Sequence, residues 1–270
     1  MIRACNRQLL AGIILVGLMT LLTIVGYFYT PHSPNEMEIS RRLEAPSGQH
    51  LLGTDNYGRD ILSRIMVGGR PAFQAGLVAV ALGLSLGILW GALAGYYRGW
   101  LEELLMRLAD GFYALPAILM ALLATTLFGP GQASILVAVA VANVPIFARI
   151  TRASFLSLRE REFVDAARAL GLSNRRIIFR HILPNALSPL LVQASVSFAA
   201  AVLAEASLSY LGLGTQPPDA SWGRMLREAQ AFADHALGSA LYPGVAIALT
   251  VLGFNQLGDG LRDILDPRLK

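Results

Sequence analysis

Six long apolar stretches, separated by shorter polar segments, constrain this 270-residue chain more than any other feature. An apolar stretch of about 20 residues can cross the hydrocarbon core of a bilayer as an α-helix. Only 15% of the residues are charged, whereas a soluble domain carries about 25%. The sequence therefore predicts an all-α, multi-pass membrane protein with six transmembrane helices. The predicted spans are residues 9–29, 72–97, 104–128, 133–150, 186–211 and 237–257.

Two of these spans carry further local signals. In the second span, Gly83, Gly87, Gly91 and Gly95 recur every fourth residue and so lie on one helix face. Small residues on one face allow another helix to approach closely in a membrane, so we expect this face to pack against a neighbouring span. In the third span, Pro116 predicts a kink.

The basic residues predict the orientation. Eight of the 22 lysines and arginines lie between residues 149 and 180, and most of the others lie on the same side of the six predicted spans. Lysine and arginine are enriched in cytoplasmic loops, so both termini and this segment are expected in the cytoplasm. Because these residues stand at the ends of apolar segments, no nucleic-acid partner is expected. The chain is divided into residues 1–70, a helix with a periplasmic loop, and residues 71–270, a core of five helices.

The segment from residue 159 to 184 is a polar, arginine-rich region between two spans. Phe163, Ala167 and Leu170 follow a helical spacing, which predicts a short helix with one apolar face. Gly171 stands where a helix C-terminus often takes a positive φ angle. Ser173 can cap a second helix, and Pro184 predicts a change of direction. Such regular patterning indicates that another protein docks on this region.

The sequence contains no phosphate-binding loop of the Gly-x-x-x-x-Gly-Lys-Ser/Thr type. If the protein moves a substrate uphill, the energy must come from another chain or from an ion gradient.

The same segment resembles the cytoplasmic coupling loop of bacterial ABC importer permeases, which reads Glu-Ala-Ala, three residues, Gly, and then a hydrophobic-x-Leu-Pro ending. Here Asp165-Ala166-Ala167 precedes Gly171, and His181-Ile182-Leu183-Pro184 ends the segment. Asp165 replaces glutamate, and His181 replaces a hydrophobic residue. The histidine is a feature of the dipeptide, oligopeptide and nickel branch.

Three more stretches resemble that branch, and specifically its second permease subunit. The first begins at His50 and includes Asp55, Arg59 and Asp60. The second extends from Glu205 to Gly214, and the third from Asn255 to Asp263, followed by Leu265-Asp266-Pro267-Arg268.

The resemblance implies a type I ABC importer permease fold with a cytoplasmic coupling helix, in a bacterial inner membrane. The implied partners are a homologous second permease, two ATPase subunits that hold ATP and Mg²⁺, and an extracytoplasmic substrate-binding protein. This chain itself is expected to bind no cofactor or metal and to catalyse no reaction. The coupling loop would cover residues 152–185, with its helix at about residues 161–170. The residues expected to carry coupling are Arg161, Phe163, Asp165, Ala166, Ala167, Leu170, Gly171, His181, Leu183 and Pro184.

Five residues are candidates for the pathway or an outer gate: Glu205, Asn143, Asp55, Arg59 and Asp60. Glu205 equally fits an acid hydrogen-bonded near the outer interface, and Asn143 fits a bond between helices. His50, Asp55 and Asp60 have the chemistry of metal ligands, but their spacing matches no common metal motif.

Two other functions are open. An intramembrane hydrolase would need a nucleophile and a base at membrane depth, and all four histidines lie in loops or near span ends. An ion-coupled secondary transporter usually shows an internal repeat and several buried acids, and neither is evident here. Within the importer branch, di- and oligopeptides are the favoured substrates, and glutathione or nickel complexes are the alternatives.

Overall fold

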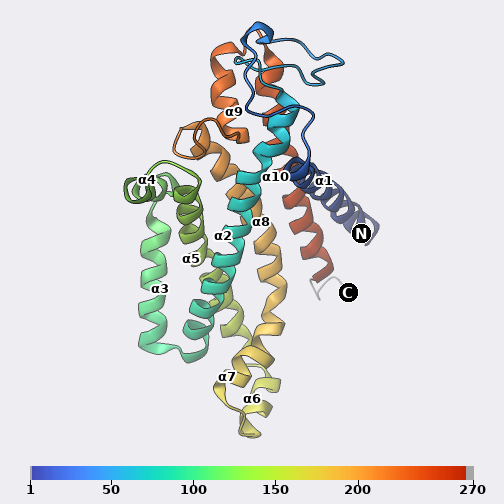
Figure 1. Ribbon diagram of the computed structural model, residues 1–270. Coiled ribbons are helices and arrows are strands. Elements are labelled where there is room, and N and C mark those ends of the chain that lie inside the picture. The colour runs from blue at the N-terminus through green and yellow to red at the C-terminus, as the bar shows by residue number, and fades with distance from the viewer. Residues whose placement is uncertain (1, 266–270) are drawn as a thin grey trace.

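The computed structural model describes residues 2–265, and almost all regular structure in this range is helical (Figure 1). Asp266, Pro267 and Arg268 of the C-terminal motif lie outside the described residues. The α-helices are α1 (Ile2–Phe28), α2 (Ile61–Tyr97), α3 (Gly99–Ala114), α4 (Ala117–Phe128), α5 (Gln132–Leu158), α6 (Glu162–Ala169), α7 (Asn174–Arg176), α8 (Leu183–Tyr210), α9 (Trp222–Ala229) and α10 (Leu237–Leu265). Short helical turns lie at Ile39–Arg41, Ile177–Ile182 and Gln230–Phe232.

The predicted number of spans is confirmed, with one of them broken. Among the described residues, five helical segments are long and apolar enough to cross a membrane. They correspond to α1, α2, α5, the continuous run from α7 through α8, and α10. The pair α3 and α4, which meet at an angle of 87°, makes the sixth when the two helices are counted as one span. The break falls at Leu115 and Pro116, because Pro116 has extended backbone angles and directly precedes α4. The predicted kink is therefore a sharp bend.

The start of the second span was predicted too late. Helix α2 begins at Ile61, whereas the sequence placed residues 61–70 in a polar loop. Asp60 caps the helix by accepting a hydrogen bond of 2.8 Å from the backbone N–H of Ser63. Arg64, one of the charged residues in this predicted loop, pairs with Asp55 and with Glu228 on α9. The charge is tolerated in the helix because a distant segment neutralises it.

The expected change of direction at Pro184 is wrong. Residues Asn174–Tyr210 form one long apolar helix, which passes through a π-helical turn at Ile177–Ile182. Pro184 lies in the first turn of α8, where the loss of its N–H costs little, and the π turn shifts the hydrogen-bond register just before it. Ser173 does precede α7, but its side chain makes no capping hydrogen bond.

The glycines of α2 form the expected packing face, and their partner is α5. A Cβ atom added at Gly87 would lie 2.5 Å from the Phe147 Cβ and 2.9 Å from the Val144 carbonyl oxygen. At Gly83, an added Cβ would lie 2.9 Å from the Asn143 Cβ. The two backbones approach so closely that only glycine fits at these positions.

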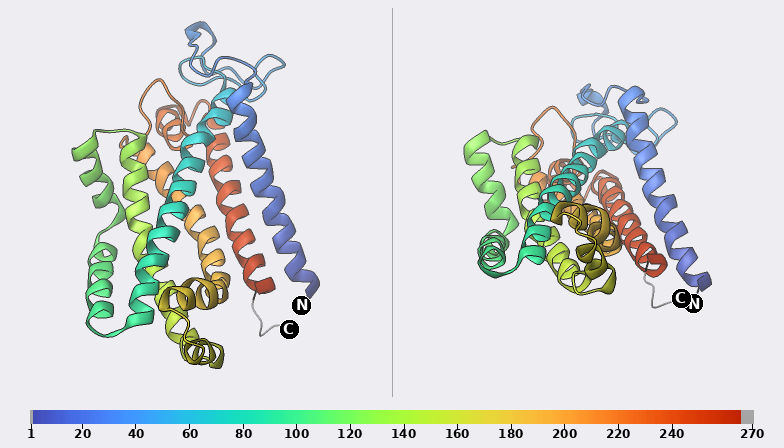
Figure 2. Two further views of the ribbon diagram at one scale, coloured as in Figure 1. Left: turned by 60° about the horizontal axis from the view of Figure 1, so that its bottom comes forward. Right: turned by 90° about the horizontal axis from the view of Figure 1, so that it is seen from below.

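The remaining helices pack around this pair. Helix α8 contacts α2 and α5, α10 lies between α8 and α1, and α1 also touches α2 (Figure 2). The first residues of α1 and the last of α10 lie at the same end of the molecule as α6 (Figure 2). This arrangement agrees with an even number of crossings.

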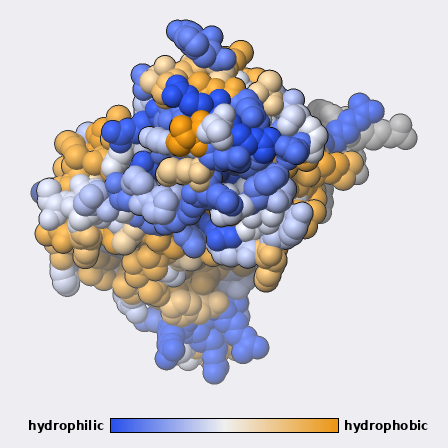
Figure 3. Space-filling view, turned by 45° about the horizontal axis from the view of Figure 1, so that its top comes forward, coloured by the Kyte–Doolittle hydropathy of each residue, from blue (hydrophilic) through white to orange (hydrophobic). Residues whose placement is uncertain are grey.

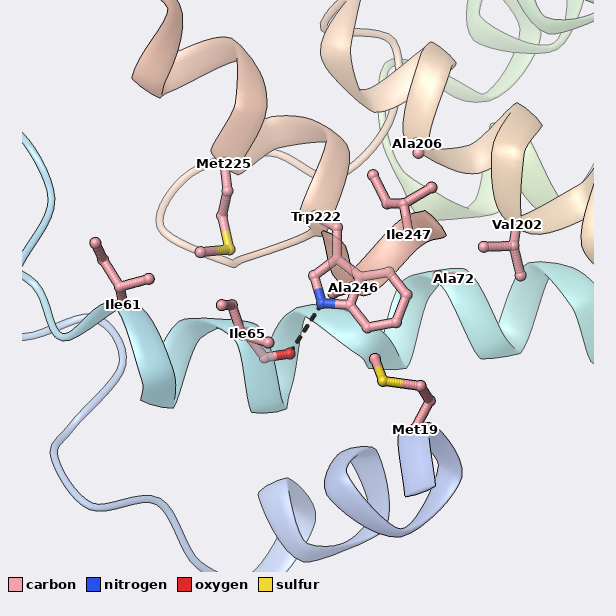
Figure 4. Close-up of a cluster of buried hydrophobic side chains, with 10 residues drawn as sticks. All are labelled: Met19, Ile61, Ile65, Ala72, Val202, Ala206, Trp222, Met225, Ala246 and Ile247. Atoms are coloured by element: carbon pink, nitrogen blue, oxygen red, sulfur yellow. Dashed lines mark hydrogen bonds between the residues drawn. The ribbon is translucent and has the colours of Figure 1, made fainter. Parts of the chain in front are cut away.

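At the opposite end, α9 folds over the bundle and inserts Trp222 into a buried apolar cluster (Figure 4). The Trp222 indole N–H donates a 3.0 Å hydrogen bond to the Ile65 carbonyl oxygen in α2. Gly68 and Gly69 leave room for the indole ring. An added Cβ would lie only 3.2 Å from an indole carbon at Gly68 and 3.0 Å from one at Gly69. The sequence predicted only an outer loop here.

The surface is polar at this end and apolar along the flanks (Figure 3). Large apolar side chains are exposed on several helices, including Leu18, Leu86, Leu123 and Leu203. Exposed leucines spread over the sides of a helical bundle fit contact with lipid tails.

The α2–α5 contact predicts a large effect of a single methyl group. We expect Gly87→Ala to lower the free energy of unfolding by about 1–3 kcal/mol, because the added Cβ must push two backbones apart. Gly17→Ala is the matched control, since nothing lies within 4 Å of an added Cβ in α1. The measurement is the thermal unfolding midpoint of each variant in the same detergent. Equal midpoints for the two variants would contradict the packing argument.

Candidate functional site

The α6 helix is anchored by a small apolar face. Val164 and Ala167 are buried in a cluster with Phe155 of α5 and Ile177 and Ile178 of the π turn. These contacts join α6 to the ends of two spans, so α6 moves with the bundle rather than as a free loop.

Polar contacts fix the same region to α2. The Tyr96 hydroxyl, at the end of α2, bonds to the Asn174 side-chain oxygen at 2.8 Å. The Arg159 guanidinium, just after α5, donates a 2.6 Å hydrogen bond to the Tyr96 carbonyl oxygen. The segment that follows α5 is therefore connected to α2, α5 and α8.

Gly171 ends α6 as the sequence predicted. Its φ angle is +72°, a value that favours glycine. The Leu172 N–H donates to the Ala167 carbonyl oxygen at 3.2 Å, and the Gly171 N–H donates to the Arg168 carbonyl oxygen at 2.9 Å. This pair of bonds is the Schellman ending, which satisfies the last carbonyls of the helix.

The outward face of α6 differs from the predicted one. The sequence placed Phe163, Ala167 and Leu170 on one apolar face, but only Ala167 is buried. Phe163 is 39% exposed and Leu170 is 78% exposed. The helix thus has two apolar sides, because Val164 and Ala167 already occupy the inner one. The outer side leaves two large apolar residues uncovered.

The other predicted coupling residues lie around this outer side. Asp165 and Arg168 form an exposed ion pair at 3.0 Å. Exposed positions are Arg161, Ala166, Gly171 and Pro184, and partly buried positions are His181 and Leu183. Most of the predicted set is therefore accessible at one end of the molecule. Its role in coupling stays a prediction.

A charged groove lies beside this end, between α3 and α5. It is lined by residues that include Glu102, Asp110, Arg149 and Arg152. Arg149 pairs with Asp110 at 2.6 Å, and the Arg152 Nε donates to Glu102 at 2.7 Å. Charges that face lipid tails are costly, so this groove must face water or another protein. The sequence analysis missed it because the pairs join residues about 40–50 positions apart.

The outer candidate residues divide between two clusters. In the first, Asp55 and Arg59 form a buried ion pair at 2.7 Å, and Arg59 also reaches Glu228 of α9. Arg64 and Arg224 complete this cluster, with Arg224 pairing with Glu228 at 2.8 Å. Sequence reasoning missed Glu228, although its spacing of four residues from Arg224 on a helix is a recognisable signal.

The second outer cluster contains Asp60 but not Asp55. The Asp60 Oδ1 lies 2.9 Å from the His50 Nδ1 and 3.7 Å from the His32 Nδ1. His32 comes from the segment just after α1 and was not among the predicted residues.

Glu205 and Asn143 are both buried within the helical bundle. Glu205 accepts a 2.7 Å hydrogen bond from the Ser209 hydroxyl one turn further along α8. The Asn143 amide donates a 2.8 Å hydrogen bond to the Val139 carbonyl oxygen in its own helix. Each bond is made within one helix, so a role for either residue in a pathway stays a prediction.

Curated relatives match nearly the whole chain. A dipeptide transport system permease protein of Alkalihalophilus pseudofirmus is 45% identical, over 98% of this chain and 87% of that protein. A putative peptide transport system permease protein of Brucella abortus is 44% identical, over 98% and 89%. A glutathione transport system permease protein of Pectobacterium atrosepticum is 43% identical, over 94% and 86%.

Solved structures share the fold. The inward-facing MetNI methionine ABC transporter matches with a TM-score of 0.62 at 18% identity, over 75% of this chain and 96% of that chain. A family model described as "binding-protein-dependent transport system inner membrane component" matches residues 87–270, which contain α6, the groove and Glu205. The chain belongs to this family of inner membrane transport components.

Proposed function

We propose that this chain is one permease subunit of an ATP-driven importer that carries di- or oligopeptides into the cell. The observation that carries the proposal is the position of α6. Its inner side is built into the ends of α2, α5 and the π turn, and its outer side exposes Phe163 and Leu170. A partner that grips the outer side can therefore move the spans through the inner side.

The partner on α6 is a cytoplasmic ATPase subunit. The arginines near α6 support a cytoplasmic position for this end by the positive-inside rule, and the first residues of α1 and the last of α10 lie on the same side. A short helix with exposed apolar residues fits a hydrophobic groove, and the surrounding arginines favour an acidic rim. ATP and Mg²⁺ are held by the ATPase, and its closure is the source of the movement.

A second permease subunit supplies the other wall of the pathway. The charged groove between α3 and α5 lies beside lipid-facing helices, yet Asp110 and Arg149 remain partly exposed there. A polar pathway shared with a second subunit would keep these charges away from lipid tails. The same arrangement leaves the outer end, with α9, to meet a substrate-binding protein.

Peptides are the substrate class that the relatives favour. Permeases named for dipeptide, peptide and glutathione transport lie within a narrow range of identity to this chain. All three names describe short peptides or a peptide-like molecule. The binding protein then selects among them, and nickel complexes are the remaining alternative within the resemblance.

Leu170→Asp tests the docking surface. We expect the variant to insert normally but to lose ATPase co-purification and peptide uptake by about tenfold, or ~1.4 kcal/mol, because a carboxylate replaces an apolar contact. Leu51→Asp is the matched control, since Leu51 is 61% exposed at the opposite end. The control should retain the ATPase. Full retention of the ATPase and of uptake by Leu170→Asp would rule out this docking surface.

Purification from the native host tests the assembly. In mild detergent we expect a second six-span permease and one or two ATPases to accompany this chain, identified by mass spectrometry. In membrane vesicles supplied with ATP, vanadate should block uptake of a labelled dipeptide. An uncoupler should leave that uptake unchanged under the same conditions. Uptake that is abolished by the uncoupler alone would favour the secondary transporter. Competition by glutathione or a nickel complex, but not by peptides, would correct the substrate.

A further inference from the structure

The end of the molecule opposite α6 contains a group of two histidines and one aspartate, of which His50 and Asp60 are buried and His32 is half-buried. His32 follows α1, His50 lies in the first outer loop, and Asp60 caps α2. One ligand-type atom from each residue lies within 4.8 Å of the other two. His50 is 5% exposed and Asp60 is 3% exposed. Three segments of the chain therefore meet at one compact polar point.

The two oxygens of Asp60 have different surroundings. Oδ2 accepts hydrogen bonds from the Ser63 backbone N–H at 2.8 Å and from the Ser63 hydroxyl at 2.7 Å. Oδ1 faces the two imidazole rings, at 2.9 Å from His50 Nδ1 and 3.7 Å from His32 Nδ1. Within residues 2–265, no arginine or lysine lies within ion-pair distance of Asp60. Besides the Ser63 donors at the start of α2, the imidazoles are the groups in contact with Asp60 that can carry a compensating positive charge.

Two imidazole nitrogens lack a hydrogen-bond partner among the described residues. These are His32 Nδ1, which is directed towards Asp60, and His50 Nε2. A buried polar atom without a partner is costly, and a bound ion would supply a partner for His32 Nδ1, whereas His50 Nε2 is not the nitrogen that faces Asp60. The rings lie close together, with centroids 4.5 Å apart, so both can serve one ligand.

The two distances from Asp60 to the imidazoles fit a small tetrahedral cation. Zn²⁺ binds histidine nitrogen and carboxylate oxygen at about 2.0–2.2 Å, so neighbouring ligand atoms lie about 3.3 Å apart. The two distances to Asp60 Oδ1, 2.9 and 3.7 Å, lie on either side of this value. The His32 side chain is 40% exposed, which gives an ion a route from the outer solvent.

We propose that His32, His50 and Asp60 form a Zn²⁺ site that ties the exit of α1 and the outer loop to the start of α2. The ligand atoms are His32 Nδ1, His50 Nδ1 and Asp60 Oδ1, and the bound ion replaces the proton between His50 and Asp60. The fourth position stays open for water or for a group from a docking protein. No metal is expected from the sequence, because the spacing of His50, Asp55 and Asp60 matches no common metal motif and gives no sign that His32 lies near them.

The test is metal binding by the full chain in detergent, purified without a polyhistidine tag and stripped with a chelator. Titration calorimetry with ZnCl₂ should show one ion per chain at low micromolar concentration, and elemental analysis should find the same ratio. Mg²⁺ and Ca²⁺ should not bind, because they prefer sites made of oxygen ligands. Zinc binding only at millimolar concentration would overturn the proposal.

Variants locate the ion. His32→Ala and Asp60→Asn should each weaken Zn²⁺ binding by at least about tenfold. Loss of a residue that only supports a metal ligand already costs about that much, so loss of a ligand should cost no less. Asparagine also serves as a helix cap, so Asp60→Asn should leave α2 intact. His235→Ala, an exposed histidine on the outer side, is the control and should bind as the parent does. Equal binding by the parent and by His32→Ala would place the ion elsewhere and overturn the assignment.

A second readout follows the backbone. Zinc should slow hydrogen exchange at the amides of residues 50–61 in the parent chain, because the ion ties this loop to α1 and α2. The same addition should have no effect on exchange in His32→Ala. Slowing in both proteins would mean that zinc acts at another place.

Discussion

The close packing of α2 against α5 is the contact on which the rest of the structure depends. Helix α2 has 37 residues, so it extends for about 55 Å from the outer loop to the region of α6. Its outer end carries the Asp60 cap and Arg64, and its inner end carries Tyr96, which bonds to the α6–α7 region. Glycines along α2 hold it against α5 over much of this length. A rigid pair of this kind can transmit movement between the two ends.

The spans could be predicted from the sequence because the bilayer imposes a length and a hydrophobicity that local sequence reveals. The errors occurred where distant residues change the cost of a local feature. Charged residues made residues 61–70 look like part of a loop, and the pairing of Arg64 with Asp55 and with Glu228, more than 160 positions away, shows why a helix can contain it. The role of α9 was missed for the same reason, because Trp222 is buried by α2, α8 and α10 together.

The α6 region was predicted well in outline and less well in detail. The end of α6 at Gly171 could be predicted because it depends on local backbone chemistry: glycine takes the positive φ angle of a helix C-terminus without strain. The split of the α6 apolar residues into an inner and an outer side cannot be predicted from local chemistry, because Val164 and Ala167 are buried by residues of α5 and of the π turn. Pro184 was misread because a π turn, which depends on a shifted hydrogen-bond register, has no simple sequence signal.

The two ends of the molecule differ in how they are held. Near α6, a small apolar face supports a helix whose other side is uncovered, which fits the docking surface proposed for it. At the outer end, buried charges and histidines connect α2 to α9 and to the segment after α1. Charged groups buried this way depend strongly on one geometry, because separating them leaves an uncompensated charge. If a partner moves α6, as proposed, the firm connection at the other end of α2 favours movement of the bundle as a unit over local bending.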